Sequence, residues 1–302
     1  MRNTDLTRRT ALLTGLALSA CAPTAPADPR ESYVPPPDDP RFAAIEARIG
    51  GRVGVAAWNT GTDAWVGHRR NEAFAMCSTF KWALAAAVLN TAQHSGGPQL
   101  DERVRYNQSV MLSHAPVTSL HLERGWMTVE ELCAAAVVTS DNPAANLLLE
   151  LQLGPEGFTR FLRANGDGVT RLDRTELALN ENLPGDPRDT TTPDAMARTL
   201  QHFLLEDGVL SAENREKLIG WMVESTTGLS RLRAGFPADW RAADKTGTST
   251  AAHNATNDVA IAWPPGRAPI IITSYFSEST VEPDARNAAH AEIARTIAGE
   301  WA

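Results

Sequence analysis

Ser78-Thr79-Phe80-Lys81, followed directly by the apolar residues Trp82-Ala83-Leu84, is the segment from which the rest of the chain is best understood. The pattern predicts a helix that begins at Ser78 and carries Lys81 one turn further along the same face. Unpaired N–H groups at a helix start stabilise developing negative charge, and a desolvated lysine can accept a hydroxyl proton. Taken alone, the four residues are better explained by an N-cap serine and a solvated lysine, because S-x-x-K arises by chance in about one chain in three of this length.

The scarcity of lysine in the chain supports a chemical role for Lys81 in this segment. The chain holds 28 basic residues, of which only Lys81, Lys217 and Lys245 are lysines. A buried lysine can lose its proton and act as a base, whereas an arginine effectively cannot. Lys81 and Lys245 are therefore candidates for chemistry.

Two further motifs follow Ser78 along the chain. Ser140-Asp141-Asn142 ends one apolar run and opens a predicted helix, and Lys245-Thr246-Gly247-Thr248 offers a cation beside a glycine that lets a ligand approach the backbone closely. Each alone fits a capping turn or a surface turn. All three in this order arise by accident in fewer than ~1 in 1000 chains.

The three motifs together resemble those of the active-site serine penicillin-binding proteins and β-lactamases. Residues 171–193, which begin Arg171-Leu172-Asp173-Arg174-Thr175-Glu176, resemble the Ω-loop of the class A β-lactamases. The resemblance spans about residues 41–302. It implies an α/β fold of the β-lactamase/transpeptidase type, with an antiparallel five-stranded sheet flanked by helices plus an all-α lobe.

The resemblance also implies the catalytic roles. Ser78 is the nucleophile that opens the β-lactam ring, and either Lys81 or Glu176 acting through a water removes its proton. Ser140 relays a proton to the ring nitrogen. Glu176 and Asn180 hold the water that hydrolyses the acyl-enzyme, and the backbone N–H groups of Ser78 and Thr248 hold the oxyanion.

The same resemblance assigns the binding residues and the brace of the loop. Arg174 and Asp189 match the ion pair that braces the Ω-loop, in which Leu177 replaces a frequent proline. The residues expected to bind substrate are Asn142 for the side-chain amide, Lys245, Thr246, Gly247 and Thr248 for the ring carboxylate, Arg231 in place of an arginine missing from residues 253–258, and His114 at the cleft wall. A surface histidine is an equal alternative for His114. Thr248 and Ser249 favour cephalosporins as well as penicillins as substrates.

Hydrophobic periodicity and turn residues predict the elements of the body. Strands are expected over Val53–Asn59, Ala64–Arg69, Ala242–Thr248, Asp258–Trp263 and Ile270–Phe276. Helices are expected over Arg41–Ile49, Phe80–Asn90, Thr128–Val138, Asn142–Leu151, Pro155–Ala164, Pro193–Leu205, Ala212–Ser225 and Ala285–Ala302. This order predicts an α/β lobe from residues 41–77 and 226–302 and an all-α lobe from residues 78–225, with the site in the cleft between them.

The first forty residues are predicted to form an export and anchoring segment. Residues 1–21 hold the pair Arg8-Arg9, an apolar stretch too short to span a bilayer, and Leu18-Ser19-Ala20-Cys21. They resemble a lipoprotein signal peptide of the twin-arginine kind, which implies a lipidated Cys21 as the only membrane contact. Residues 22–40 are rich in proline and read as a tether. The expected location is the periplasm or cell envelope.

Net charge and histidine spacing indicate which kinds of ligand or partner the protein does not bind. The net charge of −8 argues against nucleic acid, and the seven histidines show no H-x-H or H-x-x-x-H spacing of a metal site. We expect no metal or cofactor, a small-molecule β-lactam substrate and a monomer. Cys77 and Cys133 are expected to be free buried thiols.

Two other functions compete with a resistance-conferring β-lactamase. A penicillin-binding D,D-peptidase shares the three motifs but lacks a deacylating glutamate, so Glu176 with Asn180 argues against it. A non-enzymatic lipoprotein that senses β-lactams or cell-wall peptide would not need an intact deacylation set.

Overall fold

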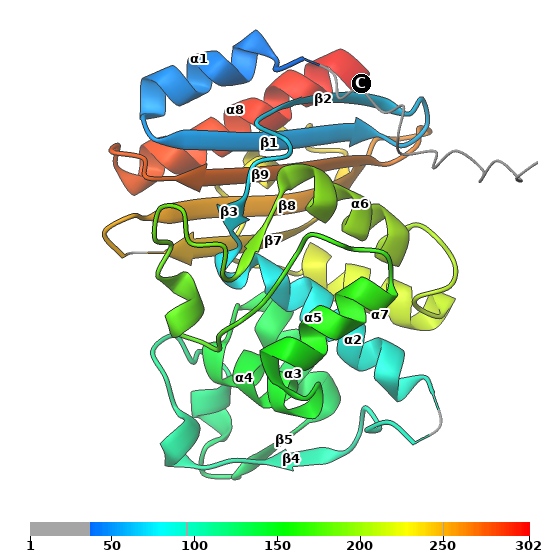
Figure 1. The fold of residues 1–302 in the computed structure, drawn as a ribbon. Coiled ribbons are helices and arrows are strands. Elements are labelled where there is room, and N and C mark those ends of the chain that lie inside the picture. The colour runs from blue at the N-terminus through cyan, green and yellow to red at the C-terminus, as the bar shows by residue number, and fades with distance from the viewer. Residues whose placement is uncertain (1–36, 95, 250) are drawn as a thin grey trace, which may run out of the picture. The chain divides into compact units, whose positions relative to one another are not determined.

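The computed structural model describes residues 37–94, 96–249 and 251–302. These residues contain a five-stranded sheet in the order β2-β1-β9-β8-β7, antiparallel throughout (Figure 1). Its strands are β1 (Arg52–Asn59), β2 (Ala64–His68), β7 (Arg241–Ser249), β8 (Ala255–Trp263) and β9 (Ile270–Ser277). Because β1 pairs with β9, strands from the two ends of the described chain complete one sheet, as the sequence predicted.

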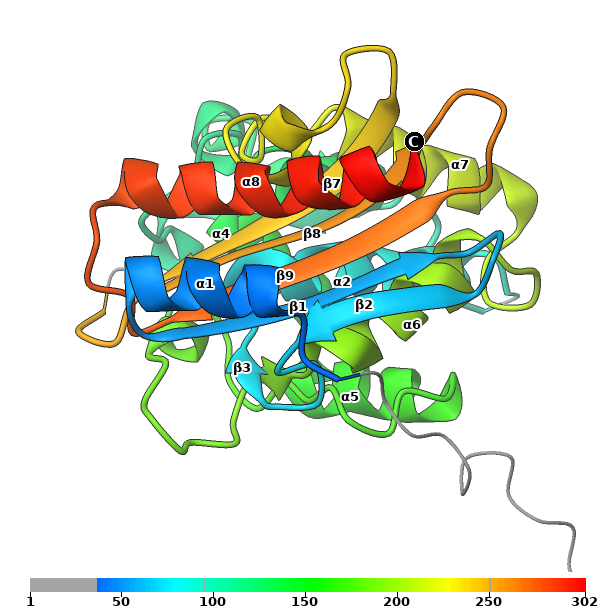
Figure 2. The same ribbon diagram turned by 90° about the horizontal axis from the view of Figure 1, so that it is seen from above.

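Helices cover both faces of the sheet. α1 (Pro40–Ile49) and α8 (Pro283–Trp301) lie across one face (Figure 2) and bury Phe42, Ile45 and Ile293 against it. α6 (Pro193–Leu204) packs on the other face against β1 and β9. The sheet is therefore a covered layer, and its edge strand β7 contacts the segment Cys77–Thr79, which contains Ser78.

The helical part is built around one buried helix. α2 (Phe80–Ala92) is apolar on all sides, and residues 80–89 are all buried, as expected for a central helix. Around it lie α3 (Val129–Val138), α4 (Asn142–Leu151), α5 (Gly154–Ala164) and α7 (Ala212–Val223). Thr128 and Glu131 form a capping box at the start of α3, and the Asp141 side chain caps α4. These caps fix where the two helices start, and hence where Ser140 and Asn142 lie.

Every helix and strand expected from the sequence is present, with ends shifted by up to three residues. The structure adds four short strands: β3 (Phe74–Ala75) pairs with β6 (Thr190–Thr191), and β4 (Arg103–Arg105) pairs with β5 (Trp126–Thr128). Strands of two or three residues are too short to show an alternating pattern. The 3₁₀ helices are η1 (Cys77–Thr79), η2 (Gln108–Val110), η3 (Thr118–His121), η4 (Ala178–Asn180) and η5 (Leu232–Gly235).

Two expectations about the organisation need correction. The segment 78–225 is not purely helical, since β4, β5 and β6 lie in it, and its helix α6 packs on the sheet, where Thr273 Oγ1 of β9 donates to Pro193 O at 2.8 Å. The folded body also begins before residue 41: the Asp39 side chain caps α1, and the Asp39 N–H donates to Gly67 O at 2.8 Å. The exact bounds of the two lobes stay a prediction, because the described residues form one compact unit.

The signal peptide, Cys21 and the tether up to residue 36 lie outside the described residues. Within the described ranges, no helix combines the length and apolarity needed to cross a bilayer.

Truncating Phe42 tests how much the α1 contact stabilises the fold. Its side chain is fully buried between α1 and the sheet, so we expect Phe42→Ala to lower the free energy of unfolding by about 3–5 kcal/mol. Chemical denaturation of residues 37–302 measures this change. Arg48→Ala on the exposed side of α1 is the matched control and should change it by less than about 1 kcal/mol; equal effects would mean that α1 adds little to the core.

Candidate active site

Ser78 stands in η1, which runs directly into α2, so the serine occupies the start of a helical segment as predicted. Cys77 before it has a positive φ of 47°, which turns the chain sharply into the helix. Ser78 is only partly buried, and its Oγ donates to Oε1 of Glu176 at 3.2 Å. The hydroxyl is therefore accessible and already in contact with a candidate base.

Lys81 is fully buried one turn into the helix and connects three of the motifs. Its Nζ donates to Ser140 O at 2.8 Å and to Asn142 Oδ1 at 2.6 Å, and it pairs with Glu176 Oε1 at 2.9 Å. Burial lowers the pKa of Lys81, while the Glu176 carboxylate opposes that shift. The structure thus brings Lys81 together with Ser140, Asn142 and Glu176.

Ser140 lies between the two buried lysines. Its Oγ accepts a hydrogen bond from Lys245 Nζ at 3.0 Å and lies 3.5 Å from Lys81 Nζ. Burial, and after it the nearby positive charge of Lys81, lowers the pKa of Lys245 to about 7. A hydroxyl between two such amines can pass a proton in either direction, which suits the relay expected of Ser140.

Glu176 is held by side chains from two elements. Asn180 Nδ2 in η4 donates to Glu176 Oε2 at 2.6 Å. Asn146 in α4 clamps the backbone of the same residue, because its Oδ1 accepts from Glu176 N at 2.9 Å and its Nδ2 donates to Glu176 O at 3.0 Å. The carboxylate is thus fixed against Ser78 and Lys81, although it comes from a loop.

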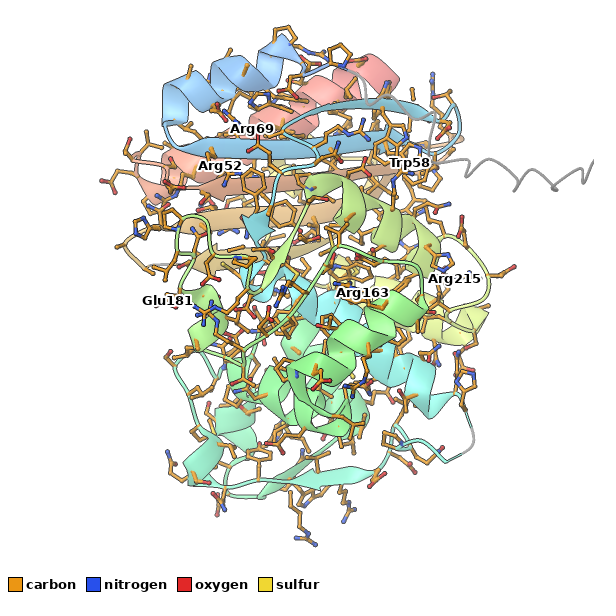
Figure 3. All side chains as sticks on the ribbon, viewed as in Figure 1. Arg52, Trp58, Arg69, Arg163, Glu181 and Arg215 are labelled. Atoms are coloured by element: carbon orange, nitrogen blue, oxygen red, sulfur yellow. The ribbon has the colours of Figure 1, made fainter. Side chains whose placement is uncertain are left out.

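The base of that loop carries the expected brace. Arg174 Nε donates to Asp189 Oδ2 at 2.6 Å, and Asp189 Oδ1 accepts the N–H groups of Asp173 and Arg174. Arg174 also pairs with Glu181, labelled in Figure 3 at the surface of the loop. The peptide bond between Glu176 and Leu177 is cis.

The end of β7 supplies the predicted carboxylate receptors. Lys245 is fully buried, Thr246 Oγ1 donates to Thr227 Oγ1 at 2.6 Å, and Thr248 Oγ1 accepts from Arg231 at 2.7 Å. The structure gives Gly247 a further role beside the one expected. A Cβ there would stand 2.5 Å from Met76 O, so the glycine admits the segment that carries Ser78. This close approach brings β7 and η1 together.

Arg231 reaches β7 from the turn before η5, as its predicted role requires. Its guanidinium donates to Gly247 O, Asn257 O and Thr248 Oγ1, and its Nε donates to Asn287 Oδ1 in α8. Only 8% of the residue is exposed. It therefore places a positive charge directly beneath the hydroxyl of Thr248.

His114 is the one expected site residue that the structure leaves at the margin. Its Nε2 contacts Thr139 O at 2.8 Å, while its backbone carbonyl accepts from Asn142 N. A cleft of about 640 Å³ is lined by Ser113, Asn142, Leu177, Ala178, Asn180, Glu181, Thr248, Ser249 and Ala251, without His114. His114 is exposed, and its contact with an expected site residue is made by its backbone carbonyl to Asn142.

Sequence reasoning missed three residues that build the site. Asn146 lies one turn after Asn142 in an otherwise apolar stretch, which is the signal that could have found it. Asp141 is fully buried and accepts from Thr118 N at 2.9 Å, which fixes the loop opposite the cleft. Asn257 in β8 donates to Ala75 O and Met76 O, at 2.9 and 3.0 Å, and so ties the Ser78 segment to the sheet.

Cys77 and Cys133 are both free and buried, as predicted, and burial raises the pKa of each thiol. In the described part of the chain, no three His, Cys, Asp or Glu side chains are grouped so that they could hold a metal ion.

Comparison with known proteins agrees with this geometry. The sequence model described as the β-lactamase enzyme family matches residues 39–301. The chain belongs to the class A β-lactamases. It is 46% identical over 300 residues to β-lactamase AST-1 of Nocardia asteroides, covering 96% of this chain and 94% of that protein. It is 47% identical over 234 residues to the carbapenem-hydrolysing β-lactamase KPC of Klebsiella oxytoca, covering 78% of each.

Solved class A structures share the fold. An ancestral class A β-lactamase, reconstructed for the last common ancestor of Gram-negative bacteria, matches with a TM-score of 0.83 and 52% identity, over 86% of this chain and 98% of that one. A β-lactamase from Xanthomonas campestris matches with a TM-score of 0.83 and 47% identity, over 87% and 97%. As a class A β-lactamase, the chain has the expected fold, with its five-stranded antiparallel sheet.

Proposed function

We propose that this class A β-lactamase hydrolyses the β-lactam amide of penicillins and cephalosporins through an acyl-enzyme on Ser78, and so confers antibiotic resistance. One observation carries the proposal: the Glu176 carboxylate lies within 3.2 Å of the Ser78 hydroxyl, pairs with Lys81, and is held by Asn180. A carboxylate fixed beside the nucleophile is what the hydrolysis of an acyl-enzyme needs.

Substrate binding uses the positive end of β7. The ring carboxylate is received by Lys245, Thr246 and Thr248, with Arg231 adding its charge through Thr248 Oγ1. Asn142, whose Nδ2 donates to Ser113 O and whose Oδ1 accepts from Lys81, lines the cleft and receives the side-chain amide. These contacts hold the ring carbonyl over Ser78.

Acylation follows from the contacts of Ser78. Its proton passes to Glu176, the acceptor its hydroxyl already faces, while Oγ attacks the carbonyl carbon. The N–H groups of Ser78 and Thr248 receive the oxyanion, and each such donor is typically worth about 3–4 kcal/mol. The ring C–N bond then breaks, and Ser140 gives its hydroxyl proton to the nitrogen while it takes a proton from Lys81. The proton held by Glu176 then passes to Lys81, its partner at 2.9 Å, so Glu176 is a carboxylate again before deacylation.

Deacylation uses the same carboxylate. Glu176 and Asn180 hold a water, Glu176 takes its proton, and the hydroxide attacks the ester carbonyl. The ester C–O bond breaks and Ser78 takes back the proton held by Glu176, which restores both groups for another cycle.

Turnover of a chromogenic cephalosporin by residues 37–302 tests the proposal. We expect many product molecules per enzyme molecule. A burst of one equivalent without further product would support a D,D-peptidase or a β-lactam sensor and overturn hydrolysis as the function.

The pKa of Lys245 sets the alkaline limit of activity. Because the charged amine binds the ring carboxylate and its pKa is lowered to about 7, kcat/KM should fall as the pH rises through about 7, since this ratio reports the free enzyme. Lys245→Arg keeps the charge at high pH, so its alkaline limb should move up by at least about one pH unit. A pH profile of kcat/KM for both proteins measures this, and coincident limbs would assign the titration to another group.

We also propose that the protein is exported and anchored in the cell envelope through a lipid on Cys21, as a monomer. The support is the sequence Leu18-Ser19-Ala20-Cys21 behind Arg8-Arg9. Expressed as the full chain, the parent should fractionate with membranes and Cys21→Ala with the soluble envelope fraction. Equal fractionation would contradict the anchor.

A further inference from the structure

A second hollow adjoins the active-site cleft across the end of β7. It has a volume of about 300 Å³, and Thr248, Ser249 and Ala251 line both hollows. The start of α8 lines its other side through Pro283, Arg286 and Asn287. A ligand bound at Thr248 can therefore extend into it.

The charge of this hollow is positive. Arg231 and Arg286 line it, together with Ser249, Asn254, Thr256 and Asn287, and none of its lining residues is an aspartate or glutamate. The hydrogen-bond partners of Arg231 are uncharged, and Arg286 NH1 donates to Val281 O at 2.9 Å. Within the described residues neither guanidinium forms a salt bridge. Asp258 and Asp244 lie near enough to offset part of the charge of Arg231, so the field that favours an anion here comes mainly from Arg286.

Two polar atoms of the lining lack the partners that buried groups normally have. Thr256 is 2% exposed, and its Oγ1 has no hydrogen-bond partner among the described residues. The buried Nε of Arg286 likewise has no hydrogen-bond partner among these residues. Buried donors are nearly always satisfied, and the exceptions call for an explanation. Both atoms belong to side chains that line the hollow, so the lining holds hydrogen-bonding groups that the protein itself leaves unused.

We propose that this hollow receives a second acidic group of the substrate, carried on the substituent next to the ring carboxylate, and that Arg286 determines specificity for it. The inference rests on the proposed function, because it takes the ring carboxylate to lie at Lys245, Thr246 and Thr248. In a cephalosporin the C3 substituent is attached beside the C4 carboxylate, so it points past Thr248. Arg231 serves the ring carboxylate through Thr248, which leaves Arg286 for the second anion.

Two cephalosporins that differ only in a terminal carboxylate or carboxamide on the C3 substituent test this. We expect Arg286→Gln to lower the ratio of kcat/KM, carboxylate over carboxamide, about tenfold, mainly through KM for the carboxylate. Arg286→Lys should retain part of the ratio. Arg295→Gln, on the exposed side of the same helix, is the matched control and should leave the ratio unchanged.

The outcomes separate the two proposals. If the parent hydrolyses neither compound, the proposed function fails. If the parent hydrolyses both, but Arg286→Gln leaves the ratio as in the parent or in Arg295→Gln, the anion-binding role of Arg286 is overturned while the proposed function stands.

Discussion

A Ser78→Ala variant is expected to lose turnover of a chromogenic cephalosporin by about 10⁴-fold or more, the scale seen when a serine nucleophile is removed. We expect the variant to lose activity while it stays folded. The Ser78 side chain is only partly buried, and among the described residues its hydroxyl makes a hydrogen bond to Glu176 alone. Steady-state rates measure the loss, and intact mass after incubation with the drug should show no adduct.

The matched control for this experiment is Ser109→Ala, since Ser109 is exposed in η2 and far along the chain from the motifs. It should turn over at the parental rate, and both variants should melt within a few degrees of the parent. Retention of turnover within tenfold by Ser78→Ala would place the nucleophile elsewhere.

The catalytic residues could be predicted from sequence because each motif fixes its own local structure. Ser78 and Lys81 share one helix face through their spacing, and Asp141 begins α4 because its side chain caps the helix. The presence of all three motifs in this order then identifies them as one site, through the resemblance to the active-site serine enzymes. Their meeting at Lys81 Nζ, which bonds to Ser140 and Asn142, depends on packing that no local pattern encodes.

The remaining features depend on contacts between distant segments. Gly247 is needed because Met76 approaches β7, and Asn146 matters because a loop thirty residues later rests on it. Neither the contact of Gly247 with Met76 nor that of Asn146 with Glu176 can be recognised from the sequence around the residue itself. The strands β3 and β6 were missed for the same reason, because a two-residue pair is defined by its partner rather than by its own sequence.

The contacts of Glu176 lead to a second large effect. Glu176→Gln cannot accept a proton from water, so we expect steady-state turnover to fall by about 10²–10⁴-fold, the contribution typical of a general base. Acylation should survive better than deacylation. The Glu176 charge now opposes the lowering of the Lys81 pKa, so its removal makes neutral Lys81 more available to take the Ser78 proton.

The expected result is a trapped acyl-enzyme. Intact mass spectrometry of Glu176→Gln after brief exposure to a penicillin should show one equivalent of drug bound, whereas the parent should show none at the end of the reaction. Glu156→Gln, whose side chain is 86% exposed on α5, is the matched control and should behave as the parent.

Adding a second change identifies the base that remains. If Lys81 takes the Ser78 proton when Glu176 is absent, the double variant Lys81→Met with Glu176→Gln should lose the adduct that Glu176→Gln alone accumulates. Lys81 is fully buried and its Nζ contacts Ser140, Asn142 and Glu176. The methionine removes the amine while it fills a similar volume. An adduct that forms equally fast in the double variant would exclude Lys81 as the alternative base. If Glu176→Gln turned over substrate at the rate of the parent, the Glu176 carboxylate would have no role in deacylation.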